Sequence, residues 1–515
     1  MSIQATILKY SHHFVVKNPT PAMIPMLYGL SSKYTQFGFI FDPKTRKQRW
    51  GPLKTFAIYV QRGIEFRFHI NQFQEFLRLI EGALVDPSSY TIEDVELPEP
   101  TKVDLPIREG WVLRPEQEEG KNFCLEITEN AADSPLLMMP TGTGKTVCAL
   151  TIASALGNRF AVVLLAQYVD KWISDIRAVM DIELNEIGVI KGSDSLIRTT
   201  YYPESGNPIP KAFVISLSTM SNWYKLYEED KNHPSLEAYH CMPYDFFTHL
   251  GIGTVLFDEV HQHPHAVYRL YCYTNAKKTI SLSATLISKD QSLQRVQHMM
   301  FPRCKRFDSV KMEKYITAHA CAYQIVNFTG SRLMISEYGR NSYSQAAYEK
   351  SLLRHKTIAK QYLTMVLDLI ESSYIDGKLE GDKLAVFVGT ANMAETLVKA
   401  ITLKWPWLDT RTYLEKDDYR NVIDPDIRVT TILSGGTAVD IPNLRVSIMT
   451  NSIDSPISNI QCLGRLRKLK DRDVRFYYLY CSTIPKQLEY HQKKLELFKD
   501  RVTEVKQLFV GTLYP

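Results

Sequence analysis

The sequence predicts an α/β fold in which two tandem parallel-sheet domains follow a small α+β domain. Short apolar runs without alternation recur between stretches long enough for helices, and such runs are typical of strands buried on both faces of a parallel sheet. The first series is 136–139, 161–166, 213–217, 254–257 and 279–282, and the second is 384–388, 429–433, 446–450 and 474–480. A length of 515 residues suits about three domains.

The first 85 residues show a different pattern. Residues 64–70 alternate apolar and polar side chains, which predicts a strand with one buried face. Asn71 then stands where a helix cap is expected, ahead of apolar residues at helical spacing over 73–80. The runs 37–41 and 55–60 also predict strands. We therefore expect a small α+β domain over 1–85.

Charge divides the chain near residue 80. Residues 1–80 hold eleven Lys and Arg against three acids, a balance of +8, and residues 81–133 hold four against fourteen, a balance of −10. A basic domain followed by an acidic, Pro- and Ser-rich linker at 86–106 is compatible with an anionic partner. On charge alone, a solvated surface is an equally good interpretation.

The composition excludes several classes of protein. With 45% hydrophobic and 23% charged residues the chain is ordinary globular protein and not a disordered one. Its eight cysteines are scattered without a CxxC pair, which argues against a disulfide framework or zinc ribbon and is typical of a reducing cytosol. No apolar stretch nears about 18 residues and the N-terminus has no signal pattern. We therefore expect no membrane span, no secretion and a cytoplasmic location.

A phosphate-binding loop lies between a predicted strand and a predicted helix. The run 136–139 leads into Pro140-Thr141-Gly142-Thr143-Gly144-Lys145-Thr146, and a helical stretch follows at 147–155. The glycines let backbone N–H groups surround phosphate oxygens, which the positive end of the helix also attracts. Lys145 would reach the β- and γ-phosphates of ATP, and Thr146 would coordinate Mg²⁺. The strict motif has Gly where this chain has Met139, a departure that leaves the residues nearest the phosphates intact.

A pair of acids ends another buried strand. The run 254–257 is followed by Asp258-Glu259-Val260-His261. An acid at the tip of a strand behind a phosphate loop is where a second Mg²⁺ ligand belongs, so we assign Asp258 to the metal. Glu259 can orient and deprotonate the attacking water. The histidines at 261, 263 and 265 do not predict zinc, because no Cys or acid at ligand spacing supports them.

Together these segments resemble the motor of superfamily 2 helicases. Residues 258–261 resemble their motif II, Ser283-Ala284-Thr285 resembles motif III, and Gln461-Cys462-Leu463-Gly464-Arg465 resembles motif VI. The region around Gln117 resembles their adenine-reading element, and 166–172 and 434–442 lie where motifs Ia and V are expected. The likeness covers about residues 107–480 in the expected order. It implies RecA-like domains at 107–305 and 306–483. The residue pattern also predicts a C-terminal helix within 484–515, at about 484–509.

The resemblance also implies a role for each matching residue. Lys145, Glu259, Gln461 and Arg465 would be catalytic, with Arg465 as an arginine finger that the second domain delivers to the phosphates. Asp440 would also contact the nucleotide. A second positively charged side chain would be either Arg467 or Lys468, because the position where the family has an arginine holds a lysine here. The residues that would couple hydrolysis to nucleic acid are His261, Ser283 and Thr285. Those that would contact the nucleic-acid backbone are Gln167, Thr219, Thr390 and Gly436.

The N-terminal domain is similar to that of phage helicases of the UvsW type, on the segment from Phe41 to Gly51. This implies an ATP-dependent DNA helicase or translocase that remodels branched or duplex DNA (forks and four-way junctions), with single-stranded DNA as a further partner. Recombination, replication and repair are the expected settings, in the host cytoplasm if the chain is phage-encoded. Lys44, Arg46, Lys47 and Arg49 would contact phosphates and Trp50 would stack on an unpaired base. Alternatively, Trp50 is a core aromatic on a solvated hairpin.

Three other functions fit parts of the sequence. An RNA helicase is one, because the motor motifs largely touch the sugar–phosphate backbone. A binding module that uses ATP only to change shape is another, although Lys145, Asp258, Glu259 and Arg465 are all present. The third, a restriction-type fusion of motor and nuclease, finds no paired-carboxylate-plus-lysine cluster in the remaining segments.

Overall fold

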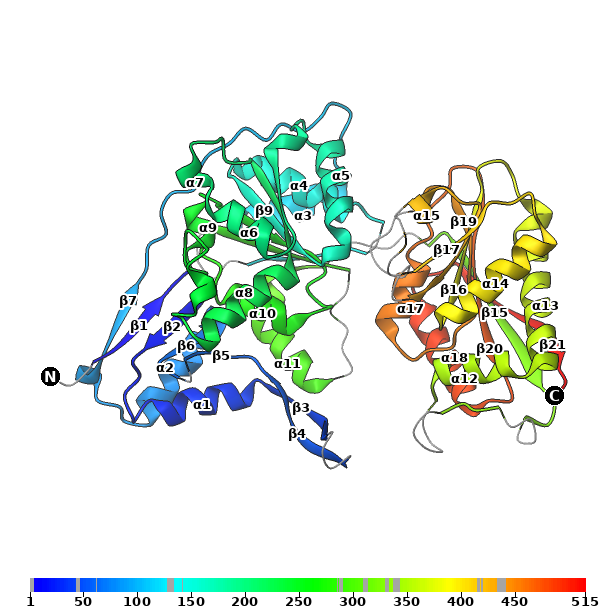
Figure 1. Ribbon diagram of the computed structural model, residues 1–515, viewed down its shortest axis with the longest axis horizontal. Helices are drawn as coiled ribbons and strands as arrows, with labels where there is room; N and C mark the ends of the chain where they lie inside the picture. The colour runs from blue at the N-terminus through cyan, green and yellow to red at the C-terminus, as the bar shows by residue number, and fades with distance from the viewer. Residues whose placement is uncertain are drawn as a thin grey trace. The chain divides into compact units, whose positions relative to one another are not determined.

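The computed structural model divides into two units, residues 1–310 and 311–515. It describes residues 4–42, 47–61, 63–126, 134–140, 142–284, 286, 290–308, 314–328, 333–336, 343–414, 417, 420–432 and 441–515, with the backbone alone at 41, 42, 47, 48 and 422. Each unit holds one seven-stranded parallel sheet, and unit 1 also carries the small α+β domain (Figure 1). The predicted fold class is confirmed.

The N-terminal domain of unit 1 is a mixed five-stranded sheet in the order β5-β6-β2-β1-β7, with two helices and a separate two-stranded ribbon. The sheet consists of β1 (Ala5–Lys9), β2 (His13–Lys17), β5 (Ile58–Val60), β6 (Glu65–His69) and β7 (Tyr90–Asp94). The helices are α1 (Ile24–Lys33) and α2 (Phe73–Gly82), and the ribbon pairs β3 (Thr35–Asp42) with β4 (Lys47–Thr55) in antiparallel register. Figure 1 shows the ribbon leading away from the rest of unit 1 beyond the end of α1.

The first parallel sheet has the order β10-β11-β9-β12-β13-β8-β14. Its strands are β8 (Leu136–Met138), β9 (Phe160–Leu164), β10 (Ile187–Ile190), β11 (Ala212–Ser216), β12 (Thr254–Phe257), β13 (Lys278–Ser283) and β14 (Arg306–Phe307). The helices between them are α3 (Pro115–Glu126), α4 (Lys145–Leu156), α5 (Val169–Val179), α6 (Ser193–Thr200), α7 (Tyr202–Ser205), α8 (Leu217–Glu229), α9 (Phe246–His249), α10 (Pro264–Tyr271) and α11 (Gln291–Met300). Each apolar run of the first predicted series coincides with one of these strands to within two residues.

The sheet of unit 2 has the order β17-β18-β16-β19-β20-β15-β21. Its strands are β15 (Ile316–Ile325), β16 (Lys383–Val388), β17 (Thr410–Tyr413), β18 (Ile427–Thr431), β19 (Leu444–Met449), β20 (Val474–Cys481) and β21 (Glu504–Leu513). Its helices are α12 (Gln345–Arg354), α13 (Lys356–Ser373), α14 (Ala391–Lys404), α15 (Arg420–Ile423), α17 (Pro456–Leu463) and α18 (Pro485–Phe498). Along β16, Leu384 and Val386 join one core cluster and Ala385 and Phe387 join the other, so both faces are buried as the apolar runs predict.

The N-terminal domain is continuous with the first motor domain. Side chains from both join one hydrophobic cluster, from Ala5 to Phe301. Strand β6 was expected to have one solvated face, but all five of its residues are buried. The Arg67 guanidinium pairs with Glu65 at 2.5 Å, lies 4.5 Å from the Tyr273 ring and donates to the Cys272 carbonyl. The polar face of β6 therefore packs on the motor, where its charges are paired.

Three boundaries differ from their expected places. The linker expected at 86–106 contains β7, which pairs in parallel with β1, and β14 places 306–307 in the first motor sheet. The expected terminal helix at about 484–509 ends at Phe498, and β21 then adds an edge strand beside β15.

Asn71 does not cap α2: its side chain donates to the carbonyls of Met299 and Met300, because α11 packs on this turn.

Among the residues that the structure describes, no helix combines the length and the apolar composition that crossing a membrane requires.

Candidate nucleotide site

The phosphate loop joins β8 to α4 at the carboxyl end of the sheet. Gly142 and Gly144 have φ of +88° and +83°, a backbone conformation that residues with a Cβ rarely adopt. Met139 needs no such freedom: it is fully buried, its φ is not positive, and its N–H donates to the Ser283 carbonyl. The position where the strict motif has glycine therefore tolerates methionine. Thr141 lies outside the described residues.

Gln117 on α3 fastens this loop. Its Nε2 donates to the carbonyls of Thr143 at 2.8 Å and Gly144 at 3.4 Å, and its Oε1 accepts from the Arg114 N–H. A Cβ on Gly144 would lie 2.0 Å from Gln117 Nε2, so a side chain at Gly144 would displace this amide. The side chain of Gln117 is thus a loop-holding group in this conformation. Its predicted contact with adenine stays a prediction.

Three predicted charges meet where β12 ends beside the loop. Lys145 Nζ lies 3.1 Å from Glu259 Oε1 and 3.8 Å from Asp258 Oδ1, with all three side chains at most 12% exposed. Burial raises the pKa of Asp258, and the Lys145 ammonium opposes that shift. Glu259 has φ of +49°, which is uncommon outside glycine and typical of functional turns. The two carboxylates and the ammonium thus form one buried ion cluster.

These residues fit ATP with Mg²⁺. The glycine loop and the first turn of α4 form the cradle of backbone N–H groups that phosphate requires. Thr146 in that turn and Asp258 offer the oxygen ligands that Mg²⁺ prefers. Together with Lys145 they would hold a triphosphate and its cation.

A tryptophan that the motifs do not include orients the metal-ligand candidate. Trp172 on α5 is 1% exposed, and its Nε1 donates to Asp258 Oδ2 at 2.8 Å. The Glu259 N–H donates to Oδ1 of the same carboxylate at 2.9 Å. Both oxygens of Asp258 are therefore held in place from inside unit 1. The sequence signal for this role is only that Trp172 ends the segment resembling motif Ia.

His261 links the two coupling segments that were predicted. Its Nδ1 lies 2.9 Å from Ser283 Oγ and 3.3 Å from Glu259 Oε2. The Val260 N–H donates to the Leu282 carbonyl beside this pair. Burial lowers the pKa of His261, so the imidazole is neutral near pH 7. Thr285 lies outside the described residues.

The remaining nucleotide-binding candidates lie in unit 2, at and after the end of α17. Gln461 is 8% exposed on the helix, Arg465 is 3% exposed just beyond it, and Lys468 is exposed. The Arg467 guanidinium donates to the Gly464 carbonyl of the same turn. The delivery of Arg465 to the phosphates, and the choice between Arg467 and Lys468, stay predictions. Asp440 lies outside the described residues.

A buried lysine underlies this segment. Lys494 on α18 is 1% exposed, and its Nζ lies 5.2 Å from the centre of the Tyr478 ring and 3.5 Å from the Asn451 carbonyl. Burial lowers the pKa of Lys494 to about 7. Sequence reasoning missed this residue, since a lysine in a helix is usually solvated.

The predicted nucleic-acid contacts of the motor have local partners. Gln167 is exposed after β9, and Thr219 at the start of α8 accepts from the Gly192 N–H at 2.9 Å. Thr390 caps α14, and its hydroxyl donates at 2.8 Å to Glu349, a buried carboxylate that also accepts from the Gly389 N–H. Thr390 therefore helps to hold the end of β16. Gly436 lies outside the described residues.

The ribbon presents the predicted DNA-binding residues that the structure describes. Trp50 is 63% exposed and its ring meets Phe39 edge-on at 5.1 Å, while Arg49 is exposed beside it. The alternative that Trp50 is a core aromatic is therefore wrong. Lys44 and Arg46 lie outside the described residues, as does the side chain of Lys47.

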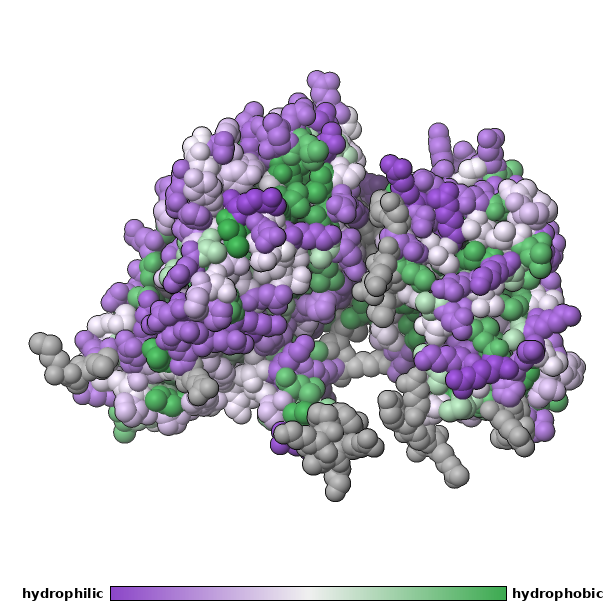
Figure 2. Space-filling view, in the orientation of Figure 1, coloured by the Kyte–Doolittle hydropathy of each residue, from purple (hydrophilic) through white to green (hydrophobic). Residues whose placement is uncertain are grey.

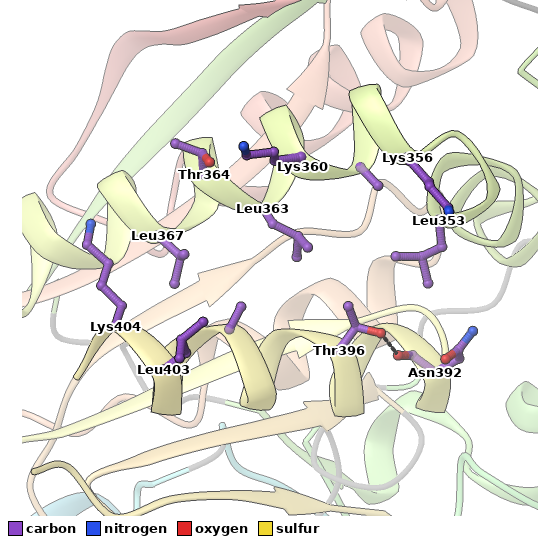
Figure 3. A pocket seen from close by; sticks show the side chains of 12 residues that line it. Leu353, Lys356, Lys360, Leu363, Thr364, Leu367, Asn392, Thr396, Leu403 and Lys404 are labelled. Atoms are coloured by element: carbon purple, nitrogen blue, oxygen red, sulfur yellow. Dashed lines mark hydrogen bonds between the residues drawn. The ribbon is translucent and has the colours of Figure 1, made fainter. Parts of the chain in front are cut away.

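A groove of about 700 Å³ in unit 2 runs between α13 and α14 (Figure 3), and leucines as well as lysines such as Lys356 and Lys360 line it. Its lining includes none of the residues predicted to bind nucleotide or nucleic acid.

No group of three or more His, Cys, Asp or Glu able to hold a metal ion occurs in the described part of the chain.

Comparison with known proteins supports this description of the motor. Residues 111–288 match the family model described as Type III restriction enzyme, res subunit. Over 419 residues the chain is 25% identical to the general transcription and DNA repair factor IIH helicase/translocase subunit XPB of Schizosaccharomyces pombe, covering 77% of this chain and 47% of that one. It is 23% identical over 400 residues to the DNA 3'-5' helicase XPB of Kineococcus radiotolerans, covering 75% and 63%.

The segments that resemble superfamily 2 helicases thus lie in the part of the chain that is similar to relatives named as helicases. A third relative, the DNA 3'-5' helicase XPB of Mycobacterium tuberculosis, is 26% identical over 233 residues and covers 44% of this chain and 37% of its own length. The chain thus spans about half the length of the curated relatives that it matches. These relatives are XPB proteins and not UvsW-type helicases, so the finer likeness of the N-terminal domain stays a prediction.

Two solved structures that are similar to the chain have low TM-scores. The helicase domain of Pyrococcus furiosus Hef has a TM-score of 0.42 at 14% identity and covers 74% of this chain and 98% of that one. S. cerevisiae Dbp5 bound to RNA and ADP BeF3 has a TM-score of 0.48 at 11% identity, covering 77% and 94%.

Replacing Trp172 by Phe tests its hold on Asp258. An aromatic ring is kept, while the N–H and the five-membered ring of the indole are lost, so we expect a weaker apparent affinity for Mg²⁺, by about tenfold, in a chain that still folds. Titrating Mg²⁺ into the chain with a fluorescent ATP analogue measures this directly. An unchanged Mg²⁺ dependence would show that the indole does not position the carboxylate.

The burial of Lys494 predicts how stability varies with pH. In the folded chain the ammonium loses its proton near pH 7, whereas the unfolded chain keeps it up to the ordinary pKa of 10.5. The unfolded state then binds more protons between these values, so the wild-type lysine costs less stability as pH rises. We expect Lys494→Met to raise the thermal unfolding midpoint at pH 7, and by less at pH 9. A gain independent of pH would contradict the shifted pKa.

Proposed function

We propose that the chain is an ATP-dependent DNA helicase or translocase. The observation that carries the proposal is the buried cluster of Lys145, Asp258 and Glu259 beside the glycine loop, in the same unit as a basic, aromatic ribbon. Two of the XPB relatives, which are DNA helicases by name, support DNA as the substrate. The resemblance of the motor segments supports hydrolysis by closure of the two motor domains, with Arg465 supplied from the second.

In this proposal each residue has a limited task. The loop and Lys145 bind the phosphates, and Thr146 and Asp258 hold the cation. ATP supplies the phosphoryl bond whose cleavage drives movement, and Mg²⁺ neutralises phosphate charge. Glu259 orients the attacking water and takes its proton. His261 lies within hydrogen-bonding distance of Ser283 and close to Glu259. It would transmit a change at Glu259 to the segment that follows β13.

Branched DNA is the finer part of the proposal. Its support is the likeness of the N-terminal domain to that of UvsW-type helicases and the exposure of Trp50 and Arg49 on the ribbon. An unpaired base at a junction would stack on Trp50, and the flanking phosphates would meet Arg49 and its basic neighbours. Forks and four-way junctions in recombination, replication or repair offer both features.

Replacing Glu259 by Gln tests the assignment of the base. We expect ATP binding to persist and the hydrolysis rate to fall by about 10²–10⁴-fold, because the amide cannot accept the proton. Direct nucleotide binding and phosphate release measure the two effects separately. Glu237→Gln, an exposed residue of the same unit, is the matched control. A fully active Glu259→Gln chain would remove this residue from the mechanism.

Replacing Trp50 by Ala tests the ribbon. Loss of one stacked base is worth about 1–3 kcal/mol, so we expect forked DNA to bind roughly 5–150-fold more weakly in fluorescence anisotropy. Trp407→Ala, which removes a 71% exposed tryptophan of unit 2, should bind forks like the wild type. Deleting residues 1–100 is a poorer test, because it would uncover the buried surface beneath β6.

The substrate is tested by ATPase and unwinding assays across forks, four-way junctions, blunt duplex and matched RNA. We expect forked DNA to stimulate hydrolysis most. Stimulation by RNA alone would replace the DNA assignment with an RNA helicase. A chain that binds ATP and DNA without turnover would be an ATP-switched binding module.

A further inference from the structure

The base of the ribbon is held by the motor through its first strand. Gln36 of β3 donates from Nε2 to Asp290 Oδ2 at 2.7 Å. The other oxygen of Asp290 accepts from the N–H groups of Ser292 and Leu293, so this residue caps α11. One carboxylate therefore fixes both the start of a motor helix and the ribbon.

The second strand of the ribbon is held by a different motor helix. His265 on α10 lies with its Nε2 at 2.8 Å from the Thr55 carbonyl, where β4 ends. The His265 ring also meets Phe56 edge-on at 5.4 Å. Burial lowers the pKa of His265 to about 4, so the imidazole is neutral near pH 7 and its N–H can donate to that carbonyl. His265, which sequence alone left without a role, thus helps to hold the ribbon.

Both helices come next in the chain after the strands that end at the nucleotide site. Helix α10 comes three residues after His261, and α11 comes after the segment that begins at Ser283. His261 and Ser283 lie within hydrogen-bonding distance of each other. Helix α11 is also held to the N-terminal domain by Asn71 at its end and by Arg295, which donates to the Lys33 carbonyl. The two coupling segments of the motor therefore both lead to the base of the ribbon.

The ribbon carries an aromatic face beyond this base. Phe37, Phe39 and Trp50 are 42%, 65% and 63% exposed, and Phe39 stands opposite Trp50 in the register. On the other face Ile40 and Leu53 lie over the glycines at 51 and 38. Figure 2 shows hydrophobic surface on the ribbon in this view. Exposed rings are suited to unpaired bases, because stacking on them is independent of base sequence. Arg49 stands opposite Ile40 in the register, so it belongs to the other face of the ribbon.

We propose that α10 and α11 couple the nucleotide site to the ribbon, so that bases on its aromatic face and nucleotide at Lys145 influence each other. Gln36 and Asp290 are the positioning residues of this joint. The inference rests on the proposed function, because it requires DNA on the ribbon and ATP in the loop. Such coupling is reciprocal in binding: DNA changes nucleotide affinity by the factor by which nucleotide changes DNA affinity.

The test is a double-mutant cycle on the joint. Gln36→Glu places two carboxylates together and breaks the hydrogen bond, so we expect stimulation of ATPase by forked DNA to fall at least about fivefold. Asp290→Asn alone should behave like the wild type, because asparagine also caps helices and the Gln36 amide can turn to match it. Combining the two changes restores a donor and an acceptor and should restore stimulation.

A matched control lies on the same interface. Gln61 donates from Nε2 to Asp230 Oδ1 at 3.4 Å, just beyond the end of α8 and outside the two strands of the ribbon. Gln61→Glu introduces the same repulsion there and should leave stimulation unchanged. The thermal unfolding midpoint and the ATPase rate without DNA, expected to match the wild type in every variant, separate coupling from loss of fold.

The outcomes are distinct. A wild-type chain whose ATPase ignores DNA would overturn the proposed function. Wild-type stimulation with an equally stimulated Gln36→Glu chain would overturn the joint alone. Loss in Gln36→Glu without recovery in the double variant, or equal loss in Gln61→Glu, would show that the hydrogen bond to Asp290 does not carry the coupling. The affinity for forked DNA with and without ATPγS and Mg²⁺ provides the second readout and should lose its nucleotide dependence in Gln36→Glu only.

Discussion

The pairing of Lys145 with Asp258 and Glu259 is the interaction on which the rest of unit 1 depends. These three charged groups, each at most 12% exposed, are tolerable because the ammonium pairs with both carboxylates and Asp258 also accepts two hydrogen bonds, since an unpaired buried charge is costly. The parallel sheet brings them together, because β8 and β12 both end at the edge where the glycine loop turns. Gln117 holds the loop, Trp172 holds Asp258, and His261 lies against Glu259. Each of these contacts keeps the cluster in a geometry that suits a triphosphate and Mg²⁺.

The N-terminal domain adds to this site because it is not a separate body. Arg67, Gln72 and the rest of the buried face of β6 and η1 (Ile70–Gln72) pack on α10 and the residues after it. The ribbon that carries Trp50 is therefore built on the same core as Lys145. Short chain segments join the ends of β12 and β13 to α10 and α11, and these helices contact the ribbon. A structural change at the strand ends can therefore be passed to the ribbon. A flexibly tethered basic domain, as the charge pattern suggests, would lack that connection.

Local patterns predicted the site better than they predicted its surroundings. The loop, the acid pair and the strands of both series were accessible because each depends on residues adjacent in sequence. The roles of Trp172, His265 and Asp290 depend on partners 86 and more residues away, so no spacing reveals them. Strand β21 was mistaken for helix because its edge position leaves polar residues along it, which hides the pattern of a strand. The polar side of β6 was mistaken for a solvated face because Glu65 and Arg67 pair with each other and Arg67 also contacts Cys272 and Tyr273, which are distant in sequence.

We expect the nucleotide site and the ribbon to change together when nucleotide binds. Hydrogen exchange of the Glu259→Gln chain, with and without ATP and Mg²⁺, tests it most directly, since this variant should bind nucleotide without consuming it. The expected result is altered exchange in the loop, in α10 and α11, and at the ribbon base around Gln36 and Thr55. Changes confined to the loop and to residues 258–261, with the ribbon base unaffected, would contradict the claim.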